Sequence, residues 1–138
     1  MMTNKVIICH IPYQDNANDN KTSKDDNKER WLIVYLEDEK YIYCYNITTL
    51  TERKSRYMKL EITKQDNDVL IHDSLVKFDK IFKIEIFNGI EEYLRNNDEI
   101  CQEDMTKIEG ETEQLKKDPR QKVVEVSKET FMRLNDNN

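Results

Sequence analysis

The chain has 138 residues, of which 37% are hydrophobic and 36% are charged, and its formal net charge is −6 at pH 7. A chain of this length forms one domain with a modest core, and its acidic balance argues against a protein that coats nucleic acid by bulk electrostatics. It has no glycine-rich phosphate loop, no apolar run of about 18 residues and no signal-peptide pattern, so we expect a soluble cytoplasmic protein without a membrane span.

The first predicted strand is Asn4–Pro12, an apolar run that ends at a proline unable to donate to a sheet ladder. Tyr13–Glu29 follows and is almost wholly Asp, Asn, Lys, Ser and Thr. Such a segment cannot anchor itself to a core, so it predicts a mobile loop, and a loop of about 17 residues usually signals function or disorder.

The next segment predicts a β-hairpin around which the rest of the chain is organised. Trp31–Leu36 is nearly all apolar, and Tyr41–Ile47 is aromatic and β-branched. Glu37–Lys40 between them is too polar to bury and contains no Asn-Gly or Asp-Gly pair, which favours a four-residue loop over a two-residue turn.

Antiparallel pairing of these two strands would bring Arg30 beside Thr48 and Thr49. A fixed cation and a hydroxyl would then share one edge of the sheet. The alternative interpretation is an exposed surface arginine and a pair of strand-ending threonines.

Leu50–Tyr57 holds the densest basic patch of this acidic chain, formed by Arg53, Lys54 and Arg56. We interpret it as a loop that contacts phosphate, with a simple solvated loop as the alternative. The alternation of apolar and polar residues in Met58–Thr63 predicts a half-buried strand after it.

Leu75–Phe78 and Ile81–Phe87 alternate again and predict the fifth and sixth strands. Asn88–Glu109 then predicts an amphipathic helix, because its first residue suits an N-cap and Glu91 completes a capping-box pattern. Its apolar stripe is thin, and Gly110 is expected to end or kink the helix.

The last part, residues 111–138, reads as a charged C-terminal extension of a domain that spans residues 1–110. Val123–Val126 could add a short strand, and Ser127 could cap a last helical turn. We expect Asn135–Asn138 to fray.

The three cysteines, Cys9, Cys44 and Cys101, have no CxxC spacing, and only His10 and His72 could join them at a metal. A disulfide framework is not expected and a zinc site is weakly supported. Because each cysteine lies on or near an apolar segment, we interpret them as small buried hydrophobes. We expect neither a metal nor a cofactor.

Three stretches in a fixed order carry a family resemblance. Arg30 heads the strand Trp31–Tyr35, Asn46–Thr49 (NITT) ends the hairpin, and Asp73–Ile84 opens with Asp-Ser. In this order they resemble the MazF/PemK-like toxins, over about residues 4–108. The resemblance implies a mainly β fold with helices (α+β), an SH3-like small β-barrel of about six strands plus a C-terminal amphipathic helix.

The resemblance also implies a metal-independent endoribonuclease that cleaves single-stranded RNA, an mRNA interferase-like toxin of a toxin–antitoxin system. The ribose 2′-OH would attack the adjacent phosphodiester and leave a 2′,3′-cyclic phosphate. Arg30 would stabilise the phosphorane and assist proton transfer, and Thr48 would hold the phosphate. Thr49 replaces Thr48 if the register differs by one residue. The remaining RNA contacts would be Thr49, Arg53, Lys54, Arg56 and Ser74.

Expected partners are single-stranded RNA, a cognate antitoxin and a second copy of the chain. A thin amphipathic helix and several aromatics between Trp31 and Tyr57 would leave apolar surface for a homodimer to cover. An acidic antitoxin segment would compete with RNA for the same cations.

The sequence departs from the family at two places, and these departures support a second interpretation of its function. The family usually has proline after the catalytic arginine and a Gly-Asp/Glu pair in its first strand, where this chain has Trp31 and Cys9-His10. The alternative is a non-catalytic SH3-like barrel that binds a peptide or RNA partner, and a structural interaction protein is a third option. His10 and His72 are of the residue type most used as general acid and base, but neither matches a catalytic position of the family.

Overall fold

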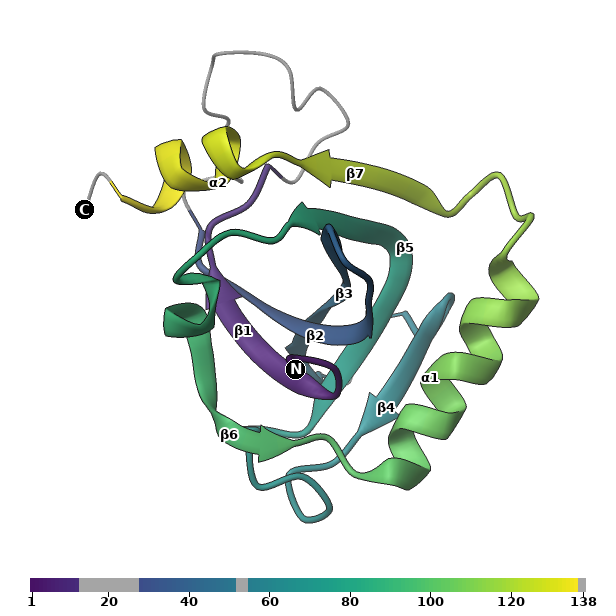
Figure 1. Cartoon of the computed structure of the whole chain (residues 1–138). Coiled ribbons are helices and arrows are strands. Elements are labelled where there is room, and N and C mark those ends of the chain that lie inside the picture. The colour runs from purple at the N-terminus through teal and green to yellow at the C-terminus, as the bar shows by residue number, and fades with distance from the viewer. Residues whose placement is uncertain (13–27, 52–54, 137–138) are drawn as a thin grey trace.

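A computed structural model describes residues 1–12, 28–51 and 55–136 of the chain. Within these residues the fold has seven strands and two α-helices, together with the short 3-10 helix η2 at Ile90–Tyr93 (Figure 1). The helices are α1 (Gln102–Leu115) and α2 (Lys128–Asn135). The strands are β1 (Lys5–Cys9), β2 (Arg30–Glu37), β3 (Tyr41–Thr49), β4 (Lys59–Ile62), β5 (Ser74–Glu85), β6 (Leu94–Glu99) and β7 (Lys122–Val126).

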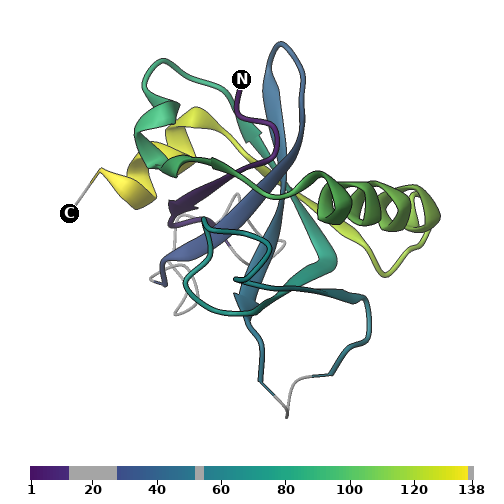
Figure 2. The same ribbon diagram turned by 90° about the horizontal axis from the view of Figure 1, so that it is seen from below.

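All seven strands belong to one sheet, in the order β4-β5-β3-β2-β1-β6, with β7 beside β5. Every pairing is antiparallel except that of β5 with β7, which is parallel. The strands wrap around a common interior, and α1 and α2 lie on opposite sides of the molecule (Figures 1 and 2). Within the described residues no ladder joins β4 to β6, so the expected barrel is not closed. The fold class is α+β, as predicted.

The predicted hairpin is confirmed, and Trp31 pairs with Ile47 across β2 and β3. Its loop is shorter than expected, because β2 continues through Glu37 and only Asp38–Lys40 remains outside the strands. The Asp38 carboxylate accepts hydrogen bonds from the backbone N–H groups of Lys40 and Tyr41, at 2.8 and 2.7 Å. These bonds satisfy backbone donors that the turn leaves outside the ladder.

The two strands predicted within residues 75–87 are a single long strand, β5. Asp79 and Lys80 do not break it, because the ladder with β3 is irregular there: Asn46 pairs with Lys77 but Cys44 pairs with Phe82. A bulge of this kind bends a strand without ending it. On its other edge β5 holds β4 along its first half and β7 along its second half.

The predicted helix Asn88–Glu109 is wrong over most of its length. Residues 90–93 form η2, residues 94–99 form β6, and α1 begins at Gln102 and runs through Gly110. The residues predicted to form one apolar stripe lie in two separate hydrophobic clusters, Ile90 in one and Ile108 in the other. The sequence of β6 is polar, but it forms a strand because it pairs with the edge of β1.

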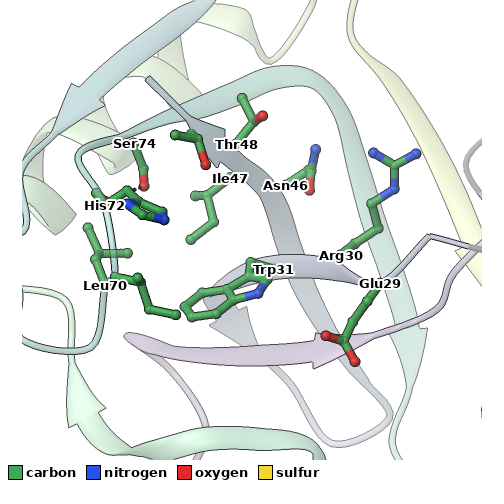
Figure 3. Close-up of a pocket in the computed structure, with 11 residues that line it drawn as sticks. Glu29, Arg30, Trp31, Asn46, Ile47, Thr48, Leu70, His72 and Ser74 are labelled. Atoms are coloured by element: carbon green, nitrogen blue, oxygen red, sulfur yellow. Dashed lines mark hydrogen bonds between the residues drawn. The ribbon is translucent and has the colours of Figure 1, made fainter. Parts of the chain in front are cut away.

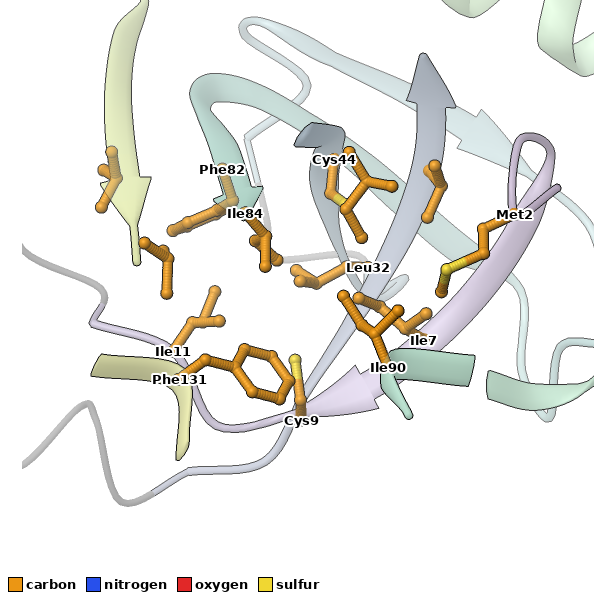
Figure 4. Packing of buried hydrophobic residues seen from close by; sticks show 14 of the residues in the cluster. Met2, Ile7, Cys9, Ile11, Leu32, Cys44, Phe82, Ile84, Ile90 and Phe131 are labelled. Carbon is orange, nitrogen blue, oxygen red and sulfur yellow. The ribbon is translucent and has the colours of Figure 1, made fainter. Parts of the chain in front are cut away.

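Two hydrophobic clusters form the core of the described part of the chain. The first packs β1, β2, β3, β5 and β7 against α2, and Figure 4 shows Phe131 of α2 with Cys9 and Ile11 at its edge. The second lies between the sheet and α1 and is built around Tyr45, Phe78 and Ile108.

The C-terminal strand and helix are both present where the sequence suggested them. β7 places Val124 and Val126 in the first cluster, and the Ser127 hydroxyl caps α2 by accepting the Thr130 N–H at 3.1 Å. Neither described helix is long and apolar enough to span a membrane.

Asn135, which was predicted to fray, is held in place at the end of α2, and Asn137 and Asn138 lie outside the described residues. The Asn135 side chain accepts the His10 N–H at 2.7 Å and donates to the His10 carbonyl at 2.8 Å. It also donates to the Phe131 carbonyl at 2.8 Å. These bonds tie the last helix to the chain just after β1, beside the first residue of β2.

Candidate functional site

A pocket of about 350 Å³ lies where β2 begins and β3 ends (Figure 3). The loop that precedes β5 closes its third side. The residues that line it are Glu29, Arg30, Trp31, Asn46, Ile47, Thr48, Thr49, Leu70, Ile71, His72 and Ser74. Four of the residues predicted from the sequence, Arg30, Thr48, Thr49 and Ser74, therefore meet in one pocket.

The strand register decides which threonine shares a side of the sheet with Arg30. Since Trp31 pairs with Ile47, the residues next to them, Arg30 and Thr48, stand opposite each other and point to the same side. Thr49 is turned to the other side and pairs with Ser74 of β5. The register places Thr48, rather than Thr49, across from Arg30.

The pocket therefore has two different walls. Arg30, Asn46 and Thr48 form the polar wall, and Trp31 and Ile47 point to the other side of the strands toward Leu70, as Figure 3 shows. The two walls meet at the ends of β2 and β3.

Arg30 is half-buried, so the alternative of an exposed surface arginine is wrong. It pairs with Cys9 of β1 and points to the same side of the sheet as Asn46 of β3, which is only 4% exposed. Asn46 was not singled out in the sequence, although a lone amide among apolar strand residues (YIYCYNI) was the signal that could have identified it.

The loop before β5 is fixed by its own hydrogen bonds. The Ser74 hydroxyl donates to the His72 carbonyl at 2.8 Å, and the Asp73 carboxylate accepts the Lys64 N–H at 2.9 Å. The Asp73 carbonyl accepts the Leu50 N–H at 2.9 Å. His72 is exposed at the mouth of the pocket, so the structure brings it to the predicted site although the sequence did not assign it there. His10 does not line this pocket.

The predicted basic patch is only partly described. Arg53 and Lys54 lie outside the described residues, as does most of the predicted mobile loop, residues 13–27. Arg56 does not line the pocket and instead forms an ion pair with Glu61 at 2.5 Å. Its guanidinium also donates to the Thr51 carbonyl at 3.3 Å.

The cysteines are placed as buried or partly buried hydrophobes. Burial raises the pKa of the Cys9 thiol, with a smaller contribution from Glu29, and burial likewise raises the pKa of Cys44. A raised pKa keeps these thiols protonated and poor as nucleophiles or ligands. In the part of the chain that is described, no three His, Cys, Asp or Glu side chains are grouped as a metal site would require.

In chemical terms, the pocket offers the guanidinium of Arg30, the carboxylate of Glu29, three hydroxyls, a buried amide, an imidazole and an indole. A guanidinium with a nearby hydroxyl suits an anion with several oxygens, above all a phosphodiester. No protein-family model matches the chain, and no curated protein sequence matches it significantly.

Proposed function

We propose that this chain is a metal-independent endoribonuclease that cleaves single-stranded RNA in the pocket at the start of β2, and that it serves as the toxin of a toxin–antitoxin pair. The observation that carries the proposal is that Arg30 and Thr48 lie on one face of β2 and β3, in the register that pairs Trp31 with Ile47, and line the same pocket. The curled sheet, with a hairpin at its centre, is also in keeping with the SH3-like barrel of the MazF/PemK-like toxins.

The proposed reaction is an intramolecular transfer. The ribose 2′-OH attacks the adjacent phosphorus, the bond from phosphorus to the 5′ oxygen breaks, and the products are a 2′,3′-cyclic phosphate and a 5′-hydroxyl. Negative charge grows on the non-bridging oxygens as the phosphorane forms. Arg30 would bind those oxygens and assist proton transfer, and Thr48 would donate a hydrogen bond to one of them.

A non-catalytic binding module is the second candidate. It is favoured by the apolar wall of Trp31, Ile47 and Leu70, which could hold a base or a peptide side chain without any chemistry. This candidate predicts binding of RNA or peptide at the pocket with no cleavage.

The proposed partners are an antitoxin and a second copy of the chain. One reason to expect a dimer is removed, because the thin helix over residues 88–109 does not form. Exposed apolar side chains remain at Leu36, Tyr57 and Val123, which are 51%, 59% and 55% exposed. We expect a dimer by light scattering, and an acidic antitoxin segment that displaces RNA and binds less tightly at raised salt.

The test is cleavage of a single-stranded RNA by purified protein in buffer that contains a chelator. Wild type should cleave, and Arg30→Ala should lose about 10²- to 10³-fold in rate, the usual cost of removing a group that stabilises transition-state charge. Lys107→Ala is the matched control, because Lys107 is an exposed cation of α1 outside the pocket. Equal rates for Arg30→Ala and wild type would refute the role of Arg30, and RNA binding without cleavage by wild type would favour the binding module.

A further inference from the structure

Trp31 is the large aromatic side chain of the pocket, and residues that do not line the pocket restrain its indole. It is half-buried and packs against the second hydrophobic cluster. From β6, the guanidinium carbon of Arg95 lies 5.4 Å from the centre of the indole ring. A cation over the ring restrains its orientation and adds a favourable cation–π contact.

The indole belongs to an apolar wall that is only partly covered by protein. Leu70 is 1% exposed and forms its buried base, whereas Ile71 beside it is 49% exposed. Figure 3 shows the indole extending toward Leu70 on the side of the strands away from the Arg30 guanidinium. Trp31, Leu70 and Ile71 all line the pocket, so a flat apolar group in the pocket could contact this wall.

The positions of Trp31 and Arg30 match the arrangement of a base and a phosphate in a stretch of unpaired RNA. The two residues are consecutive in β2, so their Cα atoms are about 3.8 Å apart and their side chains point to opposite sides of the strand. A nucleotide chain also carries its phosphate and its base on different sides of the ribose. A strand crossing the end of β2 could place a phosphate at Arg30 and a base at Trp31.

We propose that Trp31 is the stacking platform for one unpaired base of the RNA whose phosphate Arg30 holds. The position of that phosphate rests on the proposed function. The imidazole of His72 and the hydroxyl of Ser74 lie in the same pocket and suit the polar edge of a base. They suit an apolar peptide side chain less well, since such a side chain would remove water from them without replacing its hydrogen bonds.

Trp31 is the only tryptophan of the chain, so its fluorescence reports this contact directly. The probe is a single-stranded 2′-O-methyl oligonucleotide, which has no 2′-OH and cannot be cleaved by the proposed reaction. Saturating quenching of the fluorescence is expected with this probe. An oligonucleotide of the same backbone without bases should bind more weakly and leave the fluorescence unchanged.

Three variants separate stacking from phosphate binding. Trp31→Leu should weaken binding of the base-containing probe about 5- to 150-fold, the range for loss of one base–aromatic stack, whereas Trp31→Phe should stay within a few-fold of wild type. Tyr41→Leu is the control, because Tyr41 lies at the other end of β3 and does not line the pocket. It should bind as tightly as wild type.

The outcomes distinguish this inference from the proposed function. Binding seen by fluorescence anisotropy of a labelled probe, without tryptophan quenching and without loss in Trp31→Leu, would overturn the stacking role and leave Arg30 as the RNA contact. No binding by either readout would overturn both. Quenching by an apolar peptide and not by the oligonucleotide would also overturn the inference, in favour of a peptide-binding module.

Discussion

Asn67 donates a hydrogen bond of 2.8 Å to the Asp104 carboxylate, and both side chains are buried, at 1% and 6% exposure. Asn67 also donates to the Thr63 carbonyl at 2.9 Å and accepts the Cys101 N–H at 2.8 Å. One side chain thus joins the loop before β5 to the first turn of α1. Because Leu70 and His72 belong to that loop, the network fixes one wall of the pocket.

We expect Asn67→Ala to lower the free energy of unfolding by about 2–4 kcal/mol, since it removes three hydrogen bonds and leaves the buried Asp104 carboxylate without its amide donor. Urea unfolding followed by circular dichroism measures this. Asn97→Ala is the control, because Asn97 is exposed on β6 and should shift stability by only about 0.5 kcal/mol. Similar stability of both variants would show that the network is not needed.

Asn135 makes a second long-range contact that can be tested alone. We expect Asn135→Ala to cost about 1–3 kcal/mol, because the His10 N–H and carbonyl both lose their side-chain partner. Hydrogen exchange of the His10 amide should become faster. Asn135→Asp should exchange more slowly than Asn135→Ala, since a carboxylate still accepts the His10 N–H. Unchanged exchange in Asn135→Ala would contradict the contact.

The hairpin turn should have a pH-dependent stability set by Asp38. The N–H groups of Lys40 and Tyr41 and the hydroxyl of Tyr43 donate to its carboxylate and lower its pKa below the ordinary 3.8. A lowered pKa in the folded state means that the charged form stabilises the fold above pH 3.8 and that this contribution is lost as the pH falls through the folded-state pKa.

We therefore expect Asp38→Ala to melt at a lower temperature than wild type at pH 7, with a difference that shrinks as the pH is lowered below 3.8. Glu39→Ala, at the neighbouring exposed position, should show no such convergence. A difference between wild type and Asp38→Ala that is the same at pH 7 and at strongly acidic pH would be incompatible with the charged contact.

Arg30→Lys tests whether the site needs a guanidinium or only a positive charge. Lysine keeps the charge but loses the planar pair of donors that matches two phosphate oxygens. We expect RNA binding within about tenfold of wild type and a larger loss in cleavage rate, measured by single-turnover kinetics. Because Arg30 is half-buried, thermal melting of each variant is the necessary control. Full activity in Arg30→Lys would assign Arg30 a purely electrostatic role.

Local pattern was sufficient to predict the centre of this fold. An apolar run, a polar loop and an aromatic, β-branched run predicted the hairpin, and the hairpin alone placed Arg30 beside Thr48 and Thr49, because antiparallel pairing fixes which ends meet. The prediction that Ser127 caps α2 also depended only on neighbouring residues.

The parts that sequence reasoning missed depend on distant partners. Leu94–Glu99 carries no strand signal and becomes a strand because β1 offers it an edge. Trp31, Asn46 and His72 come together with Arg30 only once β3 pairs with β5 and the loop before β5 is tied to α1. The spacing of residues within one segment cannot predict that side chains from distant segments share a pocket.

The central claim is that the 2′-OH of RNA is the nucleophile in the pocket that contains Arg30. The most direct measurement uses RNA oligonucleotides in which one 2′-OH at a time is replaced by hydrogen, incubated with the protein and a chelator, with the product ends identified by mass spectrometry. We predict that a single such replacement, on the 5′ side of the cleaved bond, abolishes cleavage there, and that unmodified RNA yields a 2′,3′-cyclic phosphate. Cleavage of the substituted bond, or a product without the cyclic phosphate, would contradict the proposed mechanism.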